Sequence, residues 1–545
     1  MTDINPSVTH IFPPVGAVRW SRNVVRTEVS GHSCLVYAER PPSVPALLLD
    51  ARRWHGRTHF VQGDRRITFD AHERAVMRVT RRLQRAGIGA RDRVLLFGAN
   101  QVEWVVAFWA IQCLGGVAVL GNAWWSEKEL REVVDVIYPK LALTNAPRPG
   151  GLSFDIPHLS FGDLRALVDD DQESSELELA RIDEDDPSLI IFSSGTTGTA
   201  RGVLLSHRSV VANLHNLLVL TGRLPSELPD SHPGTVSLLS VPLFHLAGLQ
   251  VTCSTLLTGG SLVFLQGRFD AAEVLRLIEK ERVRVWGTVP TMVSRVINHE
   301  DFTRYDTSSL VSVPMGGAVV SRELRERVRA AFPGVRGGAG TLYGLTEAGG
   351  VLAAGAGSEM ERRPGCVGRP LPVVEVQIKD SDSNGVGEIL ARTPTAMSGY
   401  WGETAATVDA EGWVSTGDLG RLDEEGYLYV VGRSKDIIIR GGENIAGVHV
   451  ERALLTHPDV AEAAVVTLPH PDLGEEVGAA ILLRPGVGTG IAELRFHAAR
   501  SLARFEVPTR WWMRRTQLPT NPAGKVLRRE IANEWIGRGG GNIID

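Results

Sequence analysis

Short apolar runs alternate with amphipathic stretches along the first third of the chain. The apolar runs predict buried strands at 94–97, 117–120 and 141–143. An amphipathic stretch at 69–87 predicts a helix before the first of these strands, and two more helices are predicted between them. Each of those two opens on a capping-box pair, Asn100-x-x-Glu103 in one and Ser126-x-x-Glu129 in the other. Strands and helices that alternate with short links are typical of a parallel, doubly wound α/β sheet.

The same alternation continues after residue 187. Apolar runs predict strands at 188–191, 283–286 and 310–313. Helices are predicted to start at Ser206, after the cap Asp270-x-x-Glu273, and at Arg322. The intervening stretch 169–186 is strongly acidic, and we interpret it as a solvated spacer.

Size and charge narrow the class of protein. A chain of 545 residues is too long for one core, so two or more domains are expected. The net charge is −5 and no basic stripe stands out, which argues against a nucleic-acid partner. The most apolar long segment, 236–264, is interrupted by Pro242, His245 and Gly259, so we expect no membrane span.

The N-terminus lacks the pattern of a signal peptide, and a cytoplasmic location is expected. The four cysteines lie far apart and form no CxxC pair, which suits a reducing compartment and argues against structural zinc; they are Cys34, Cys113, Cys253 and Cys366.

The segment 192–202, with the sequence FSSGTTGTARG, is the strongest candidate for chemistry. Its glycines let backbone N–H groups turn inward, its hydroxyls are neutral donors, and Arg201 adds a permanent positive charge. These groups together could bind a polyphosphate. The spacing is not that of a P-loop, because no Gly-Lys-Ser/Thr follows.

Four further motifs lie downstream, in a fixed order. They are TLYGLTE at 341–347, WVSTGDL at 413–419, GYLYVVGRSKD at 426–436 and LPTNPAGKVLRR at 518–529. With the phosphate-binding loop, they resemble the signatures of the adenylate-forming superfamily of acyl-CoA synthetases, nonribosomal adenylation domains and luciferases. The resemblance covers roughly residues 60–530. It departs from the usual loop at Ala200, where proline is expected, and at Arg201, where lysine is expected.

The resemblance implies an α/β fold in two parts. A large N-terminal domain of doubly wound mixed sheets, residues 1–433, would bind ATP and the acyl group. A small α+β C-terminal domain, residues 434–545, would move about a hinge at Lys435. It also implies ATP, Mg²⁺ and coenzyme A as cofactor and co-substrates, and it leaves a homodimer open.

The resemblance assigns most nucleotide contacts to the large domain. Tyr343 would stack on adenine, Asp418 would accept from the ribose hydroxyls, and Glu347 would bind Mg²⁺, for which a hard carboxylate oxygen is suited. The remaining predicted ATP or AMP contacts are Ser194, Gly195, Thr196, Thr197, Gly198, Arg201, Gly317, Ala318, Gly344, Thr346 and Arg433. Thr197, Glu347 and His245 are also counted among the catalytic residues.

The small domain would supply one catalytic lysine and a loop for coenzyme A. Lys525 matches the lysine that bridges the substrate carboxylate and the α-phosphate as pyrophosphate leaves. The predicted coenzyme A contacts are Arg440, Gly441, Gly442 and Glu443. Nearby, Gly447 and His449 replace the usual proline and acid.

The acyl pocket is expected to contain His245, Thr288, Met292, Gly317 and Ala318, by position in the resemblance. Taken alone, His245 in its apolar run would read as a core histidine; the resemblance places it between the ATP and acyl sites. The segment lacks the aspartate with which amino-acid-activating relatives bind an α-amino group, so a fatty or other hydrophobic acid is the expected substrate.

The predicted reaction has two steps: formation of an acyl-adenylate, and then transfer of the acyl group to coenzyme A. One alternative is a ligase that loads a separate carrier protein. A second is a nucleotide-binding homologue without catalysis, in view of Ala200 and Arg201, although Glu347, Asp418 and Lys525 are intact. An oxidative, luciferase-like activity on the same fold is a third alternative.

Overall fold

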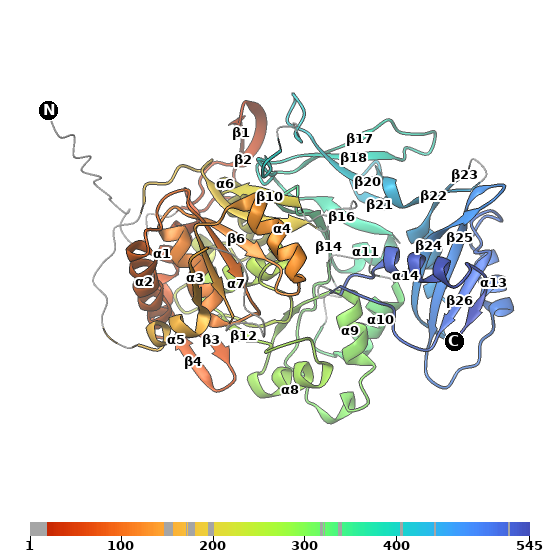
Figure 1. Ribbon diagram of the computed structural model, residues 1–545, viewed down its shortest axis with the longest axis horizontal. Coiled ribbons are helices and arrows are strands. Elements are labelled where there is room, and N and C mark those ends of the chain that lie inside the picture. The colour runs from red at the N-terminus through yellow and green to blue at the C-terminus, as the bar shows by residue number, and fades with distance from the viewer. Residues whose placement is uncertain are drawn as a thin grey trace.

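The computed structural model describes residues 19–145, 156–170, 172, 180–193, 201–316, 320, 322–335, 340–363, 365–403, 407–440, 443–521 and 524–545. Its α/β architecture has a large N-terminal part and a smaller C-terminal part, drawn in blue at the right of Figure 1. The expected fold class is therefore confirmed. No helix among the described residues is long and apolar enough to cross a lipid bilayer.

Two sheets form the first half of the large part. A seven-stranded sheet has the order β19 (Gly399–Tyr400), β10 (Arg201–Ser206), β9 (Pro187–Ser193), β6 (Val117–Gly121), β5 (Arg93–Phe97), β7 (Leu141–Thr144) and β8 (His158–Ser160). A five-stranded sheet has the order β13 (Val285–Gly287), β11 (Val236–Leu239), β12 (Ser261–Phe264), β3 (Thr58–Gln62) and β4 (Arg65–Thr68). Most neighbours are parallel, but β10–β19, β9–β10 and β3–β4 are antiparallel, so both sheets are mixed.

One hydrophobic core joins these two sheets. Helix α3 (Val102–Cys113) is buried along its whole length. The same core takes residues from α1 (Val44–Asp50), α2 (Phe69–Arg85), α6 (His207–Thr221) and α7 (Leu246–Leu257). A helix that is apolar on every side can be stable only inside such a layer, since no face of it is suited to water.

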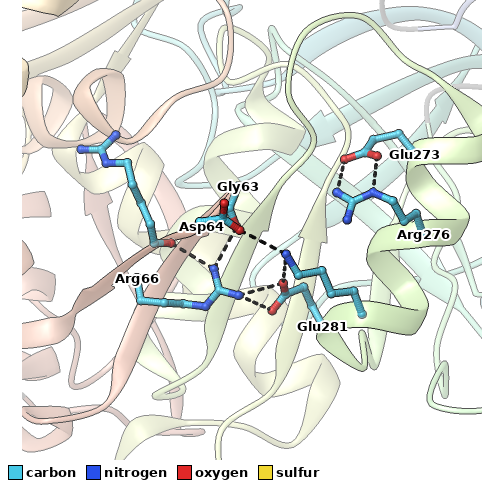
Figure 2. A network of polar contacts seen from close by, with 8 residues as sticks. Gly63, Asp64, Arg66, Glu273, Arg276 and Glu281 are labelled. Carbon is cyan, nitrogen blue, oxygen red and sulfur yellow. Dashed lines mark hydrogen bonds and ion pairs between the residues drawn. The ribbon is translucent and has the colours of Figure 1, made fainter.

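Two smaller cores cover the outer faces. Helix α4 (Glu127–Ile137) packs on the seven-stranded sheet. The five-stranded sheet is covered by α8 (Ala271–Glu281), α9 (Pro290–Ile297) and α10 (Arg322–Ala331). Figure 2 shows a charged network that ties the β3–β4 turn to α8: Arg66 contacts Glu281 at 2.9 Å, and Arg276 pairs with Glu273 on the same helix.

A third, antiparallel sheet completes the large part. Its order is β14 (Thr341–Leu345), β15 (Gly350–Gly355), β16 (Cys366–Pro370), β21 (Leu428–Arg433), β20 (Val414–Leu422), β18 (Gly387–Arg392) and β17 (Glu375–Lys379). The C-terminal part has its own sheet, β23 (Glu443–Ala446), β22 (Ile437–Arg440), β25 (Gly474–Leu483), β26 (Arg510–Arg514) and β27 (Ile543–Ile544), with β24 (Val460–His470) paired to β25. Helices α12 (Gly447–Leu455), α13 (Ile491–Ala499) and α14 (Arg528–Gly537) accompany it.

Two local predictions are wrong. Asn100 does not cap α3; Gln101 holds the N-cap position, and the Asn100 side chain bonds to the backbone of Val241 and Leu243. The stretch 310–313 is not a regular strand. It contributes an isolated bridge between Ser312 and Val285, and Met315 bridges to Thr288 and Thr341. These bridges connect the five-stranded sheet to the antiparallel one.

The caps predicted at Ser126 and Asp270 are confirmed, and so is the helix start predicted at Ser206. Ser126 and Glu129 form the reciprocal capping box of α4. Asp270 accepts from the N–H of Glu273 at 2.9 Å, and Ser206 caps α6 by accepting from Ser209. The division at residues 433 and 434 stays a prediction, consistent with β21 ending at Arg433 and the next sheet starting at Ile437.

Candidate active site

The phosphate-binding loop connects β9 to β10. Its predicted contacts Ser194, Gly195, Thr196, Thr197 and Gly198 lie outside the described residues. Ser193 and Arg201 are register partners, so the two ends of the loop lie side by side. Strand β9 runs parallel to β6, and its carboxyl end is the edge where ligands bind in open α/β sheets.

Arg201 is held by two neighbours, one in β19 and one in the segment after it. Its Nε donates to Glu403 Oε1 at 2.8 Å, and its Nη2 pairs with the other carboxylate oxygen. Its guanidinium also lies over the Tyr400 ring, 3.4 Å from the centroid. The hydrogen bond from Arg201 lowers the pKa of Glu403. The charge of Arg201 is thus balanced by protein groups, and its contact with ATP stays a prediction.

Tyr400 also reaches the predicted metal ligand. Its hydroxyl donates to Glu347 Oε1 at 3.1 Å, while the backbone N–H of Met397 donates to the carbonyl of Glu347 at 3.0 Å. The pairing of β10 with β19 brings Tyr400 here, opposite Val203. Sequence reasoning missed Tyr400 and Glu403 because the Gly-Tyr-Trp segment carries no local signal of this pairing.

Glu347 suits Mg²⁺ as a single carboxylate. Among the residues that the structure describes, no group of three or more His, Cys, Asp or Glu side chains is placed to hold a metal ion. Mg²⁺ commonly uses one or two carboxylates together with substrate phosphates, so the donor set fits an ion that arrives with ATP.

Strand β14 carries the tyrosine and glycine of the TLYGLTE motif. A Cβ on Gly344 would lie 2.0 Å from the carbonyl oxygen of Gly350, so only glycine fits the irregular pairing of β14 with β15 at this point. Thr346 follows the strand and is half-buried, in the turn that leads to Glu347. The predicted phosphate contact of Thr346 stays a prediction.

Asp418 is the centre of a second polar cluster. It is 6% exposed and is the register partner of Arg433, whose Nε lies 3.0 Å from Asp418 Oδ1. Tyr343 donates its hydroxyl to Asp418 Oδ2 at 2.8 Å. Burial raises the pKa of Asp418, and Arg433 and Tyr343 oppose that rise. Three predicted nucleotide contacts are thus brought together, from two neighbouring strands and β14.

Lys525 lies close enough to this cluster to interact with it electrostatically. Burial lowers the pKa of Lys525, as do the charges of Arg433 and Arg528, while Asp436 and Asp418 act in the opposite direction. The Lys525 side chain is nevertheless exposed to solvent, so its ammonium stays hydrated. The structure therefore places the predicted catalytic lysine near the predicted ribose-binding aspartate.

His245 occupies the N-cap position of α7. Its ring lies 4.7 Å from that of Phe244, which in turn contacts Trp124. Burial lowers the pKa of His245 to about 4, so the imidazole is neutral at pH 7. The side chain of Asn100 fixes the backbone of the segment that leads to His245. It donates to the Val241 carbonyl at 2.9 Å and accepts from the Leu243 N–H at 2.8 Å.

Thr288 directly follows β13, the strand next to β11, and Met292 lies in the first turn of helix α9. The Thr288 hydroxyl contacts Met292 Sδ at 3.5 Å, and both side chains are buried. His245 follows β11 and Thr288 follows β13, and these strands are parallel neighbours. His245 and Thr288, both predicted to line the acyl pocket, therefore follow strands that end at the same edge of one sheet. The other predicted members, Gly317 and Ala318, lie outside the described residues.

The predicted hinge links the two parts, and the predicted coenzyme A loop follows it in the small part. Lys435 is in the short 3₁₀ helix Ser434–Asp436, which connects β21 to β22. Arg440 and Glu443 pair at the end of the β22–β23 hairpin, whose tip residues Gly441 and Gly442 lie outside the described residues. Arg440 donates to the carbonyl of Phe505 at 3.2 Å. The hinge and coenzyme A roles stay predictions.

Comparison with known sequences identifies the relatives of this chain. The AMP-binding enzyme family matches residues 49–401, and the AMP-binding enzyme C-terminal domain matches residues 449–525. The chain is 30% identical to a 4-coumarate–CoA ligase-like 2 of Arabidopsis thaliana, over 91% of this chain and 93% of the relative. It is 29% identical to a long-chain-fatty-acid–CoA ligase of Bacillus subtilis, over 90% and 94%.

Solved structures give the same result. ATP-bound MatB from Rhodopseudomonas palustris aligns with a TM-score of 0.79 at 25% identity, covering 90% of this chain and 98% of that one. The o-succinylbenzoate CoA synthetase of Bacillus subtilis, in complex with ATP and magnesium, aligns with a TM-score of 0.76 at 26% identity, covering 90% and 99%. The match over both domains, together with the polar clusters around Glu347 and Asp418, shows that this chain belongs to the AMP-binding enzyme family and is an AMP-forming acid–CoA ligase.

Proposed function

We propose that this enzyme converts a hydrophobic carboxylic acid to its coenzyme A thioester through an acyl-adenylate. In the first step, a carboxylate oxygen attacks the α-phosphorus of ATP and pyrophosphate leaves. In the second, the thiol of coenzyme A, losing its proton, attacks the acyl carbonyl carbon and AMP leaves. The observation that carries the proposal is the polar cluster in which Asp418 pairs with Arg433 at 3.0 Å and accepts from Tyr343 at 2.8 Å, with Lys525 in electrostatic contact with it.

The first step depends on charge that is already in place. Lys525 would lie between the carboxylate and the α-phosphate, where its ammonium offsets the negative charge that brings the two together. Asp418 would accept from the ribose hydroxyls and so orient the nucleotide. Glu347 would hold Mg²⁺, which when bound neutralises charge on the phosphates. No protein nucleophile is required, since positioning and electrostatics account for this kind of phosphoryl chemistry.

A hydrophobic acid is favoured by the groups near the proposed pocket. The neutral imidazole of His245 packs beside Phe244, and Met292 is buried next to Thr288. None of these groups would pair with a second charge on the substrate. The names of two relatives, a 4-coumarate–CoA ligase-like protein and a long-chain-fatty-acid–CoA ligase, also support an acid with an apolar body.

The acceptor and the substrate can be tested together. Pyrophosphate release is measured with purified enzyme, ATP and a panel of aliphatic, aromatic and dicarboxylic acids, each with and without coenzyme A. We expect apolar monocarboxylic acids to react fastest, and thioester to form with free coenzyme A. Preference for dicarboxylic acids would contradict the substrate class. Adenylate that forms but is not transferred to free coenzyme A would favour the carrier-protein alternative.

A further inference from the structure

Helix α9 contacts the loop that carries Lys525. The Thr291 hydroxyl donates to the carbonyl oxygen of Gly524 at 2.8 Å, across the boundary between the large and small parts. Thr291 is the residue before Met292, which belongs to the proposed acyl pocket. In Figure 1 the green helix α9 lies on the side of the large part that faces the blue C-terminal sheet.

The loop itself is a tight turn closed by Asn521. The Asn521 side-chain oxygen accepts from the Lys525 N–H at 2.8 Å, and the Asn521 backbone exchanges hydrogen bonds with Lys525 and Gly524. Thr520 and Val526 pair as a bridge at its base. These bonds fix Asn521, Gly524 and Lys525 relative to one another, so the way the loop sits on α9 sets the position of the Lys525 backbone.

Gly524 lies against the helix without room for a side chain. A Cβ at this position would be 2.6 Å from Thr291 Oγ1 and 2.6 Å from Val289 Cγ2. The backbone of Gly524 also has φ of +76°, in the region that favours glycine. The close approach and the hydrogen bond both involve Thr291 and Gly524, so Thr291 is a direct contact between helix and loop.

A charged residue one turn along the helix faces the same loop. Arg295 contacts the hydroxyl of Thr520 at 3.5 Å. It also opposes the rise that burial causes in the pKa of Glu462, on β24 of the small part. Glu462 in turn accepts from the N–H of Leu518 at 2.8 Å, just before the loop. The loop is thus met by α9 at two positions.

We propose that Thr291 is a positioning residue for Lys525: its hydrogen bond to Gly524 seats the lysine loop on α9 and so sets the lysine for adenylate formation. The proposal rests on the proposed function, because it takes Lys525 as the group that acts in the first step. Thr291 itself touches neither ATP nor the acid in this account. Its effect reaches the reaction only through the placement of the lysine.

The test compares the two half-reactions in Thr291→Val, which keeps the shape of the side chain and removes the donor. We expect pyrophosphate release to fall by about 3- to 10-fold, the effect of losing one hydrogen bond. Thioester formation from acyl-adenylate supplied ready-made should stay within about 2-fold of the parent enzyme. Thr291→Ser, which restores a hydroxyl, should recover most of the adenylation rate. Equal loss in both half-reactions, or no loss in either, would overturn the proposal.

A double-mutant cycle with Lys525→Ala separates this inference from the proposed function. If Thr291 acts through Lys525, Thr291→Val should change the residual adenylation rate of Lys525→Ala by less than about 2-fold. A full additional loss in that background would show that Thr291 acts by another route. If Lys525→Ala alone leaves adenylation intact, it is the proposed role of the lysine that fails.

Discussion

Single residues in the site are oriented by protein partners that also satisfy their charge. Asp418 is buried, and it keeps its carboxylate in place through Arg433 on the next strand and the hydroxyl of Tyr343. Arg201 is forked to Glu403 in the same way. Because a buried charge without partners would be costly, the contacts with Arg433 and Tyr343 explain how the Asp418 carboxylate is held in place.

Lys525→Ala should block the first half-reaction and spare the second. Removal of one preorganised charge donor costs on the order of 10²-fold or more in rate. Pyrophosphate release is therefore expected to fall by that amount, while thioester formation from supplied acyl-adenylate continues. Lys280→Ala, at an exposed site on α8, serves as the control and should leave both steps unchanged. Equal losses in both half-reactions would refute the assignment.

Tyr400→Phe should weaken the response to Mg²⁺. The substitution removes the hydroxyl that donates to Glu347 but keeps the ring beneath Arg201. We expect the Mg²⁺ concentration that half-saturates ATP binding, measured by calorimetry, to rise by about 3- to 10-fold, as for one lost hydrogen bond. Tyr429→Phe makes the same chemical change away from the site, where the hydroxyl donates to Asp423 at 3.2 Å. Identical Mg²⁺ curves for Tyr400→Phe and the parent would rule out this role.

At the scale of elements, the segment between β11 and α7 depends on a residue far away in sequence. Its backbone at Val241 and Leu243 is buried and bonds to the side chain of Asn100, at the start of α3. The segment ends at His245, so the hydrogen bonds from Asn100 fix the backbone that leads to this proposed acyl-pocket residue. A buried backbone without such a partner would lose the free energy of its hydrogen bonds to water.

Asn100→Ala should lower both stability and affinity for the acid. It leaves one buried N–H and one buried carbonyl without their partner, which costs about 1–3 kcal/mol of unfolding free energy. We expect a lower urea midpoint and a higher KM for the acid, with KM for ATP little changed. The neighbouring Gln101→Ala, whose side chain bonds near the surface, is the control. An unchanged KM for the acid in Asn100→Ala would show that this segment does not shape the pocket.

At the scale of the whole molecule, buried neutral histidines connect separate parts of the large domain. His207 accepts from the N–H of Val44 at 3.2 Å, and His215 stacks on Tyr37 with ring centroids 3.7 Å apart. His59 donates to the carbonyl of Gly260 at 3.2 Å. Burial lowers the pKa of His59 to about 3 and those of His207 and His215 to about 4. The folded protein therefore excludes protons that the unfolded chain would bind.

Stability should fall as the pH drops below about 6.5, the ordinary histidine pKa. Because the folded pKa values are lower, the stabilisation is fully present above pH 6.5 and is lost on the way down to about pH 4, at up to about 1.4 kcal/mol per pH unit for each histidine. Urea unfolding at pH 7, 6, 5 and 4.5 measures this slope. His215→Gln removes one of the groups that take up a proton on unfolding. It should therefore reduce the slope of unfolding free energy against pH by up to about 1.4 kcal/mol per pH unit. A flat profile from pH 7 to 5 would contradict the prediction.

Much of the fold could be predicted from the sequence because its signals are local. The caps of α4 and α8 join residues three apart, Ser126 with Glu129 and Asp270 with Glu273, and these bonds need no partner from elsewhere in the chain. Most of the apolar runs likewise form buried strands as predicted, and the run 310–313 is the exception. Five motifs in order identified the family, and the comparisons confirm it.

The tertiary structure decided the contacts between segments that are distant in sequence. Asn100 carries a capping signal, yet its side chain bonds to a loop more than a hundred residues later, and that competing partner is absent from any local window. Tyr400 reaches Glu347 only because β19 pairs with β10, and Thr291 meets Gly524 only because the small part docks on α9. Sequence determined these elements through hydrogen bonds and burial within a few residues; which side chains meet across them follows from strand order and domain packing, which depend on the whole chain at once.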